Sequence, residues 1–203
     1  MEKSPIFEKT YKDYLAQVAK LDFKELQDRL GIEVTEGKAV IPFFGKPYAV
    51  SEHGIVGPSG KKPYLSISVI LCKYLLMCPE SDPKEDNWVS FKDFKDASPL
   101  TDAFLNYSER PIANLFAGRV NDLEKTCKTI GGFSPSEEFS YDLSIQFNAL
   151  PKVPVLLLFN DSDDEFPAQC LVLFERRTEK YLDMECVAMV GMLLYEYLKA
   201  EAT

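Results

Sequence analysis

Four carboxylates lie within five residues of this chain, at Asp161, Asp163, Asp164 and Glu165. Carboxylate oxygens are the ligands that calcium and magnesium prefer, and paired carboxylates can serve as general acid and base when their surroundings separate their pKa values. The same acids can instead form a solvated turn, accept backbone N–H groups that fix the loop, or pair with Arg176 or Arg177. This acidic loop is the only dense polar cluster beside a predicted core, so it is our first candidate for a functional site.

Two runs of apolar, strand-favouring residues flank the acidic loop, one from Val153 to Phe159 and one from Phe166 to Glu175. Both runs are too apolar for a sheet with one wet face, so we predict a central hairpin covered on both sides. A ligand beside this hairpin would meet the polar groups of Asp164 and Glu165. Its apolar wall would come from three aromatic residues, Trp88, Phe91 and Phe166.

A metal site made of Asp161, Asp163, Asp164 and Glu165 is a weaker prediction. Successive residues of a strand face opposite ways, which separates neighbouring carboxylates. The loop also fails the EF-hand pattern, because Phe166 stands where that loop needs glycine and Val172 where it needs glutamate.

Little else in the sequence suggests catalysis. The one histidine, His53, lies in a turn-like Glu-His-Gly, far from any serine or cysteine with a matching pattern. The stretch from Gly57 to Pro63 resembles a phosphate loop but has Lys62 where serine or threonine should bind magnesium, so we interpret it as an exposed turn. We therefore favour a protein that is not an enzyme, and the sequence indicates no particular cofactor.

Charge and cysteine usage restrict the class of protein. The net charge of −9 argues against a nucleic-acid partner, and 13 acidic against 5 basic residues in 132–203 give the C-terminal part an acidic field. No apolar run reaches the ~18 residues that span a bilayer. The charged N-terminus lacks the apolar region of a signal peptide. The five cysteines form no Cys-x-x-Cys pair and suit a reducing compartment. We expect a cytoplasmic protein that does not bind membranes and has a small-molecule or protein partner; its oligomeric state is left open.

The hydrophobic periodicity predicts an α+β protein with one domain over 1–203, divided into an N-terminal helical segment (1–31) and an α+β body (32–203). We expect a mostly antiparallel sheet with the apolar hairpin at its centre, packed by about five to six helices. The predicted elements are a helix whose cap is Ser4, a strand meander over 32–57, an apolar helix over 69–78, a short strand at Trp88, a helix from Ser108 to Ile130, a strand over 139–150, and a buried C-terminal helix over 184–199.

Several segments together resemble one family, in this order: Cys72-Lys-Tyr-Leu-Leu, Asn87-Trp-Val-Ser-Phe-Lys-Asp-Phe, Gly131-Gly132, Leu150-Pro-Lys-Val-Pro-Val-Leu, Asp163-Asp-Glu-Phe-Pro-Ala and Leu173-Phe-Glu. Their order and spacing resemble the bacterial family of unknown function numbered 3786, from about Lys38 to the C-terminus. The resemblance implies an origin in anaerobes, where some members of the family carry an additional four-cysteine iron–sulfur domain. This sequence has no such cysteine cluster.

Residues and resemblance together predict a non-catalytic small-molecule or partner-binding protein; the resemblance implies a place in anaerobic metabolism that involves corrinoids or iron–sulfur proteins. The alternatives are a carboxylate-based, divalent-metal-dependent enzyme and a purely structural or interaction protein. The Asp164-Glu165-Phe166-Pro167 stretch is the most specific motif. It could also have a purely structural role, in which it fixes the conformation of the hairpin.

Overall fold

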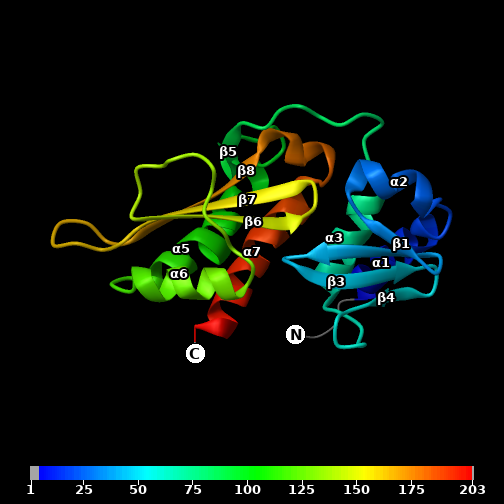
Figure 1. The fold of residues 1–203 in the computed structure, drawn as a ribbon, viewed down its shortest axis with the longest axis horizontal. Helices are drawn as coiled ribbons and strands as arrows, with labels where there is room; N and C mark the ends of the chain where they lie inside the picture. The colour runs from blue at the N-terminus through cyan, green and yellow to red at the C-terminus, as the bar shows by residue number, and fades with distance from the viewer. Residues whose placement is uncertain (1–4, 203) are drawn as a thin grey trace.

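Two four-stranded antiparallel sheets, bridged and covered by helices, make up the fold (Figure 1). The computed structural model describes residues 5–202, so the cap predicted at Ser4 lies outside the described residues. The α+β class and the antiparallel pairing are confirmed, with two sheets in place of one. Among the described residues, none of the helices has the length and apolar character needed to cross a bilayer.

The first sheet is the predicted meander. In the sequence, helices α1 (Pro5–Val18) and α2 (Phe23–Leu30) precede it and helix α3 (Leu65–Leu76) follows it. Its strands β1 (Glu33–Thr35), β2 (Lys38–Phe43), β3 (Lys46–Ser51) and β4 (Gly54–Val56) pair in sequence order. Both of its first two turns have positive φ at their central residues, at Glu36-Gly37 and at Phe44-Gly45. Turns of this kind match the twist of paired strands, which explains the tight meander.

The second sheet contains the acidic hairpin and has the order β5-β8-β7-β6. Its strands are β5 (Trp88–Ser90), β6 (Leu143–Leu150), β7 (Val153–Asn160) and β8 (Gln169–Glu175). Strand β7 is buried along its length, as predicted, but β8 alternates between buried and exposed residues. The prediction that both hairpin strands are covered on both sides is therefore wrong for β8.

The helix predicted from Ser108 to Ile130 is two helices. Short turns η1 (Phe91–Asp93) and η2 (Ser98–Leu100) lead into a continuous helical run made of α4 (Thr101–Phe104), the π-helical turn η3 (Leu105–Glu109) and α5 (Arg110–Phe116). Ser108 is buried inside this run and is not a cap. The chain then breaks at Gly118, whose φ is 72°, before α6 (Val120–Thr129).

The last helix, α7 (Met184–Glu201), follows the turn η4 (Arg176–Lys180) and is largely buried, as predicted. Asp183 caps it by accepting a hydrogen bond from Cys186 N at 2.9 Å, and Lys73 of α3 pairs with the same carboxylate at 2.8 Å. A Cβ atom at Gly191 would lie 2.4 Å from the Phe104 ring, so α7 and α4 pack more closely than alanine would allow.

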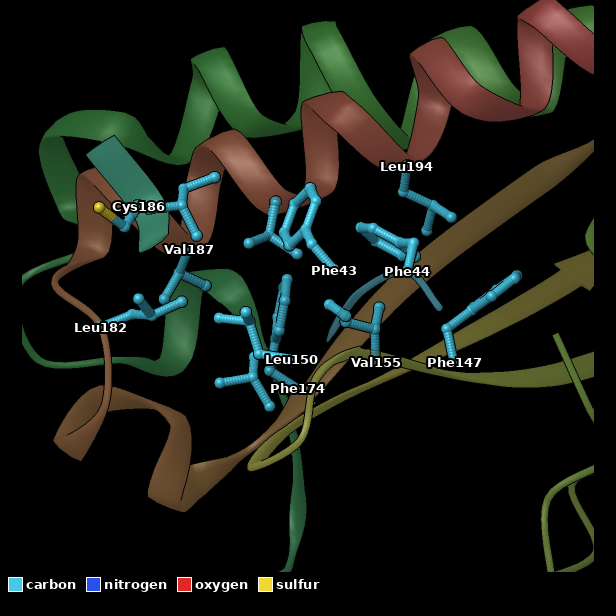
Figure 2. Close-up of a cluster of buried hydrophobic side chains, with 14 of the residues drawn as sticks. Phe43, Phe44, Phe147, Leu150, Val155, Phe174, Leu182, Cys186, Val187 and Leu194 are labelled. Carbon is cyan, nitrogen blue, oxygen red and sulfur yellow. The ribbon is translucent and has the colours of Figure 1, made fainter. Parts of the chain in front are cut away.

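One hydrophobic cluster links the two sheets. Figure 2 shows Phe43 and Phe44, from the end of the first sheet, among side chains of the second sheet and α7, including Phe147 and Leu194. Phe44 also donates its backbone N–H to the carbonyl of Ala149, at 3.0 Å. The sheets therefore share a core, and the C-terminal helix packs against both.

Candidate functional site

The acidic loop is fixed to the protein by two of its four acids. Asp161 accepts hydrogen bonds from Gly118 N at 2.5 Å and Val120 N at 3.2 Å, so its carboxylate joins the hairpin to the start of α6. Partial desolvation opposes ionisation, but these bonds and one from Ser162 N together keep the pKa of Asp161 below its usual value. Asp161 is therefore a structural anchor.

Asp163 folds the tip of the hairpin onto itself. Its Oδ1 accepts backbone N–H bonds from Glu165 at 2.8 Å and Phe166 at 2.7 Å, while its own N–H donates to the Phe166 carbonyl at 3.0 Å. Aspartate commonly stabilises tight turns in this way. Two of the four predicted metal ligands are thus bonded to backbone amides, and the described residues contain no group of three or more His, Cys, Asp or Glu side chains placed to hold a metal ion.

The remaining loop residues, Asp164, Glu165 and Phe166, are exposed at the tip of the hairpin. Figure 1 shows this tip projecting well beyond the rest of the molecule. Exposed carboxylates at such a tip are in contact with solvent. They can attract a cationic partner, but they are not enclosed as the ligands of a buried site would be.

The predicted aromatic wall is not assembled around that tip. Trp88 of β5 lies opposite Glu175, at the end of β8 far from the acidic loop, about 20 Å along the strand from Gln169. Phe91 is buried in η1, where its ring stacks on Phe104 at 4.4 Å. The structure thus brings Asp164, Glu165 and Phe166 together, places Trp88 at the other end of the sheet, and puts Phe91 in the core.

Trp88 shares one face of the second sheet with residues that the sequence did not indicate. Directly paired residues of antiparallel strands point to the same side, so the register assigns faces. We call the face that carries Trp88 the outer face. Its members across the four strands are Trp88 and Ser90 of β5, Gln169, Leu171, Leu173 and Glu175 of β8, Pro154, Leu156, Leu158 and Asn160 of β7, and Ser144, Gln146 and Asn148 of β6.

The outer face is separate from the main core. Leu156 and Leu158 are buried but do not belong to the hydrophobic cluster, which contains their neighbours Val155, Leu157 and Phe159 on the opposite, inner face. Helices α5 and α6 contact the sheet, and Phe174 of the inner face packs against Phe94 and Phe104. The connection from α6 to β6, residues 130–142, crosses the strands in Figure 1 and reaches the side of the sheet away from α5 and α6. Its Phe133 forms a β-bridge with Gln146 of the outer face.

Large apolar side chains are exposed on and around this face. Leu171 is 36% exposed at the centre of β8, Phe133 is 41% exposed beside β6, and Phe166 is 61% exposed at the hairpin tip. Single exposed apolar residues are ordinary, but several on and around one sheet face are typical of interaction surfaces.

Acidic residues surround the hairpin end of the outer face. The chain from Phe133 to Gln169 has seven acids and one basic residue, Lys152, which lies at the opposite turn and pairs with Asp82 at 3.4 Å. The exposed members at the hairpin end are Glu137, Glu138 and Asp142 from the α6–β6 connection and Asp163, Asp164 and Glu165 from the hairpin. The nearest basic side chain of α6's start, Arg119, pairs with Asp122 at 3.0 Å. This end of the molecule therefore carries an uncompensated negative field.

The cysteine and histidine side chains, which could act as nucleophiles or bases, are poorly placed for catalysis. Burial raises the pKa of the Cys72 thiol to about 12, and it also raises the pKa of Cys127, Cys170 and Cys186 well above the usual range. His53 lies in the exposed β3–β4 turn beside Glu52. The geometry offers an apolar, acidic surface for binding and, among the described residues, no activated nucleophile.

Comparison with known proteins gives one match. A family model described as a domain of unknown function (DUF3786) matches residues 22–197. No curated protein and no solved structure matches the chain. The matched range includes both sheets, the hairpin and most of α7, so it includes the whole outer face.

Proposed function

The chain belongs to the DUF3786 family of unknown function, and on that premise we propose that it is a non-catalytic protein-binding module. Its binding surface is the outer face of the second sheet together with the acidic hairpin tip. The partner is a protein segment that presents apolar side chains flanked by lysine or arginine. The observation that supports this most is the exposure of Leu171 beside the buried Leu158 and the half-buried Leu173 on the same sheet face.

The apolar part of the proposal follows from the register. Leu171 lies opposite Leu158, and Leu173 lies opposite Leu156, so β7 and β8 form two adjacent apolar pairs on this face. A partner that covers Leu171 would remove the apolar surface that water still reaches, which favours binding by about 25 cal/mol per Å². Trp88 and Phe166 extend the apolar surface toward the two ends of the strand.

The electrostatic part follows from the rim of acids. Asp164 and Glu165 remain free to pair with an incoming cation, because the backbone of their loop is already fixed by Asp163. Such rim charges chiefly raise the association rate and exclude acidic partners, and salt weakens both effects. The exposed apolar area is small, so we expect affinities in the micromolar range, typical of transient contacts.

The only tryptophan of the chain lies on the proposed surface, which gives a direct test. Peptides in which apolar residues alternate with lysine should change the emission of Trp88 and bind with micromolar affinity. Versions with glutamate in place of lysine should not bind. Calorimetry with the same peptides checks the affinity without relying on the fluorophore.

Two matched variants locate the site. Leu171→Glu should weaken peptide binding at least tenfold, whereas Tyr107→Glu, at an exposed apolar residue of η3 outside the proposed surface, should leave it unchanged. Equal binding of the lysine and glutamate peptides, or unchanged binding by Leu171→Glu, would contradict the proposal.

The cysteines support a location in a reducing compartment, such as the cytoplasm, and we propose it on that ground. All five are free thiols, and four of them are buried in the core as small apolar side chains. The role in anaerobic metabolism that the family resemblance implies stays a prediction.

A further inference from the structure

We propose that the partner of the outer face is a second copy of this chain, which docks its own basic loop there, so that the protein associates head to tail. This proposal rests on the proposed binding function and names its partner. The basic loop is the connection between β4 and α3, residues Val56 to Tyr64, on the first sheet.

The basic loop has the apolar and charged groups that the outer face requires. Tyr64 is 80% exposed and Val56 is 47% exposed, and these are the two exposed large apolar residues that the structure shows in the first-sheet half. Lys61 and Lys62 lie between them and are also exposed. An apolar pair flanking two ammonium groups is the inverse of the outer face, where apolar residues are flanked by carboxylates.

The charge of the two regions is complementary over long stretches. The sequence has no acidic residue from Gly54 to Pro79, but it has Lys61, Lys62 and Lys73. By contrast, the segment that carries the exposed acids around the hairpin, from Phe133 to Gln169, has one basic residue, Lys152, and that residue pairs with Asp82. Opposite fields on two surfaces steer them together and disfavour pairing of either surface with itself.

The backbone of the basic loop is already ordered for docking. Gly57 N donates to the Lys61 carbonyl at 2.8 Å, and Gly60 N donates to the Gly57 carbonyl at 2.9 Å, with Gly60 at a φ of 73°. Tyr64 begins α3, and its carbonyl accepts hydrogen bonds from both the N–H and the hydroxyl of Ser68. A pre-organised loop loses less entropy on binding than a mobile one.

The two surfaces lie in different halves of the molecule. Figure 1 shows the hairpin tip at the far left and the β4–α3 connection below the first sheet, at the other side of the view. A single chain cannot bring them into contact without separating the sheets, which share one core. The contact is therefore intermolecular and heterologous, and it leaves one free outer face and one free basic loop at the ends of every open chain of copies.

Two variants that each remove one surface test this arrangement. Leu171→Glu disables the outer face and keeps the basic loop. Lys61→Glu combined with Tyr64→Ser disables the loop and keeps the face; Lys62 is left in place because its ammonium lies 4.9 Å from the centre of the Tyr11 ring. All three positions are exposed, so both variants should unfold at the temperature of the unchanged protein, which circular dichroism checks first.

Sedimentation velocity then distinguishes head-to-tail association from other forms. The unchanged protein should show a sedimentation coefficient that rises with protein concentration and falls as salt is raised from 0.05 to 0.5 M, values chosen to lie on either side of ~0.1 M, where the screening length is about 10 Å. Each variant alone should remain monomeric. An equimolar mixture of the two should form a dimer and nothing larger, because one intact face meets one intact loop.

Three results would overturn the inference. One is an unchanged protein that stays monomeric at every concentration, and another is a mixture of the two variants that does not dimerise. The third is self-association of the loop variant alone, which would show that outer faces pair with each other. The peptide titration followed by Trp88 is independent of all three, so a monomeric protein that still binds lysine-containing peptides retains the proposed function and loses only the second copy as its partner.

Discussion

The inner and outer faces of the second sheet alternate along the same strands, yet they have different surroundings. On the inner face, Val172 and Phe174 are completely buried and belong to the cluster that joins both sheets. On the outer face, Leu171 and Leu173 are of similar apolar character but remain partly exposed. The sequence of β8 is apolar in both registers, and only the helices on one side make the faces unequal.

This contrast separates stability from binding. A side chain on the inner face contributes to folding because it fills space between a sheet and helices that are both present in the same chain. The partly exposed Leu171 and Leu173 of the outer face contribute less to folding, because water still reaches them, and they are free to contribute to association. Substitutions at adjacent positions of one strand should therefore have different consequences.

The largest expected effect is from Phe174→Ala on the inner face. Its ring is fully buried at 6.0 Å from Phe104 and 6.5 Å from Phe94, so its loss leaves a cavity and should lower the free energy of unfolding by about 3–5 kcal/mol. Denaturant unfolding measures this. The neighbouring Leu173→Ala is the matched control and should cost less than about half as much, since Leu173 is half-buried. Equal decreases in the free energy of unfolding for the two variants would show that the outer face contributes to the hydrophobic core as much as the inner face does.

Much of the fold was predictable because local signals agreed with tertiary structure. The glycine-marked turns of the meander, the cap at Asp183 and the uniformly apolar β7 all specify their elements directly. The two faces of β8 were not predictable, since apolar residues in both registers do not show which side a helix will cover. Within β8, the polar residues Gln169 and Glu175 share the register of Leu171, but Glu175 is buried, so polarity does not identify an exposed register either.

The break between α5 and α6 shows a second limit. Apolar residues continue at near-helical spacing across Gly118, so periodicity predicts one helix. The start of α6 is instead bonded by Asp161, whose carboxylate arrives from the hairpin 41 residues further along the chain. A cap supplied from so far away leaves no local pattern. The distance between the predicted site residues also left no local pattern, because Trp88 pairs with Glu175 at one end of β8 while the acidic loop precedes the other end.

The Asp161→Ala substitution tests whether the loop acids are anchors or ligands. It removes the acceptor for Gly118 N and Val120 N, so we expect a loss of about 0.5–2 kcal/mol, the usual cost of removing a helix cap. The pKa of Asp161 is lowered in the folded protein, so its contribution is present above the ordinary aspartate pKa of about 4 and is lost as pH falls through the lower folded value. Thermal unfolding of both proteins at several pH values should show their difference shrinking in acid.

The control for this comparison is Asp164→Ala at the tip of the same loop. Its side chain is exposed, and the substitution should change stability by less than about 0.5 kcal/mol. If Asp164→Ala lowered the free energy of unfolding as much as Asp161→Ala, the side chain of Asp164 would also stabilise the loop. The distinction between acids that fix the loop and acids that are free to bind a partner would then not hold.

A smaller effect is expected from Glu109→Gln, which lies between the helices and β8. Glu109 accepts a hydrogen bond from Val172 N at 2.9 Å in a buried setting. Burial raises the pKa of this carboxyl despite that bond and the charge of Lys92. The folded protein therefore holds the proton more tightly than the unfolded chain, and stability falls as pH rises from the ordinary glutamate pKa of about 4.3 through the raised one. Glutamine keeps an oxygen acceptor without the charge, so the variant should gain stability relative to the unchanged protein toward neutral pH. Denaturant unfolding between pH 4 and 8 measures the difference. A variant that is less stable at neutral pH would show that the ionised carboxylate is itself favourable.

The smallest expected change in stability is from Leu171→Ser, one residue before Val172. Exposed apolar residues lose little when they become polar, so the free energy of unfolding should stay within about 0.5 kcal/mol of the original. The same substitution should reduce both peptide binding and self-association, because it removes the exposed centre of the outer face. Denaturant unfolding and sedimentation velocity on one preparation give both quantities. A large loss of stability with intact association would place Leu171 in the core of the sheet and leave the outer face without a binding role. Unchanged stability with lost association, by contrast, can arise only if the exposed leucine contributes to the complex and not to the fold.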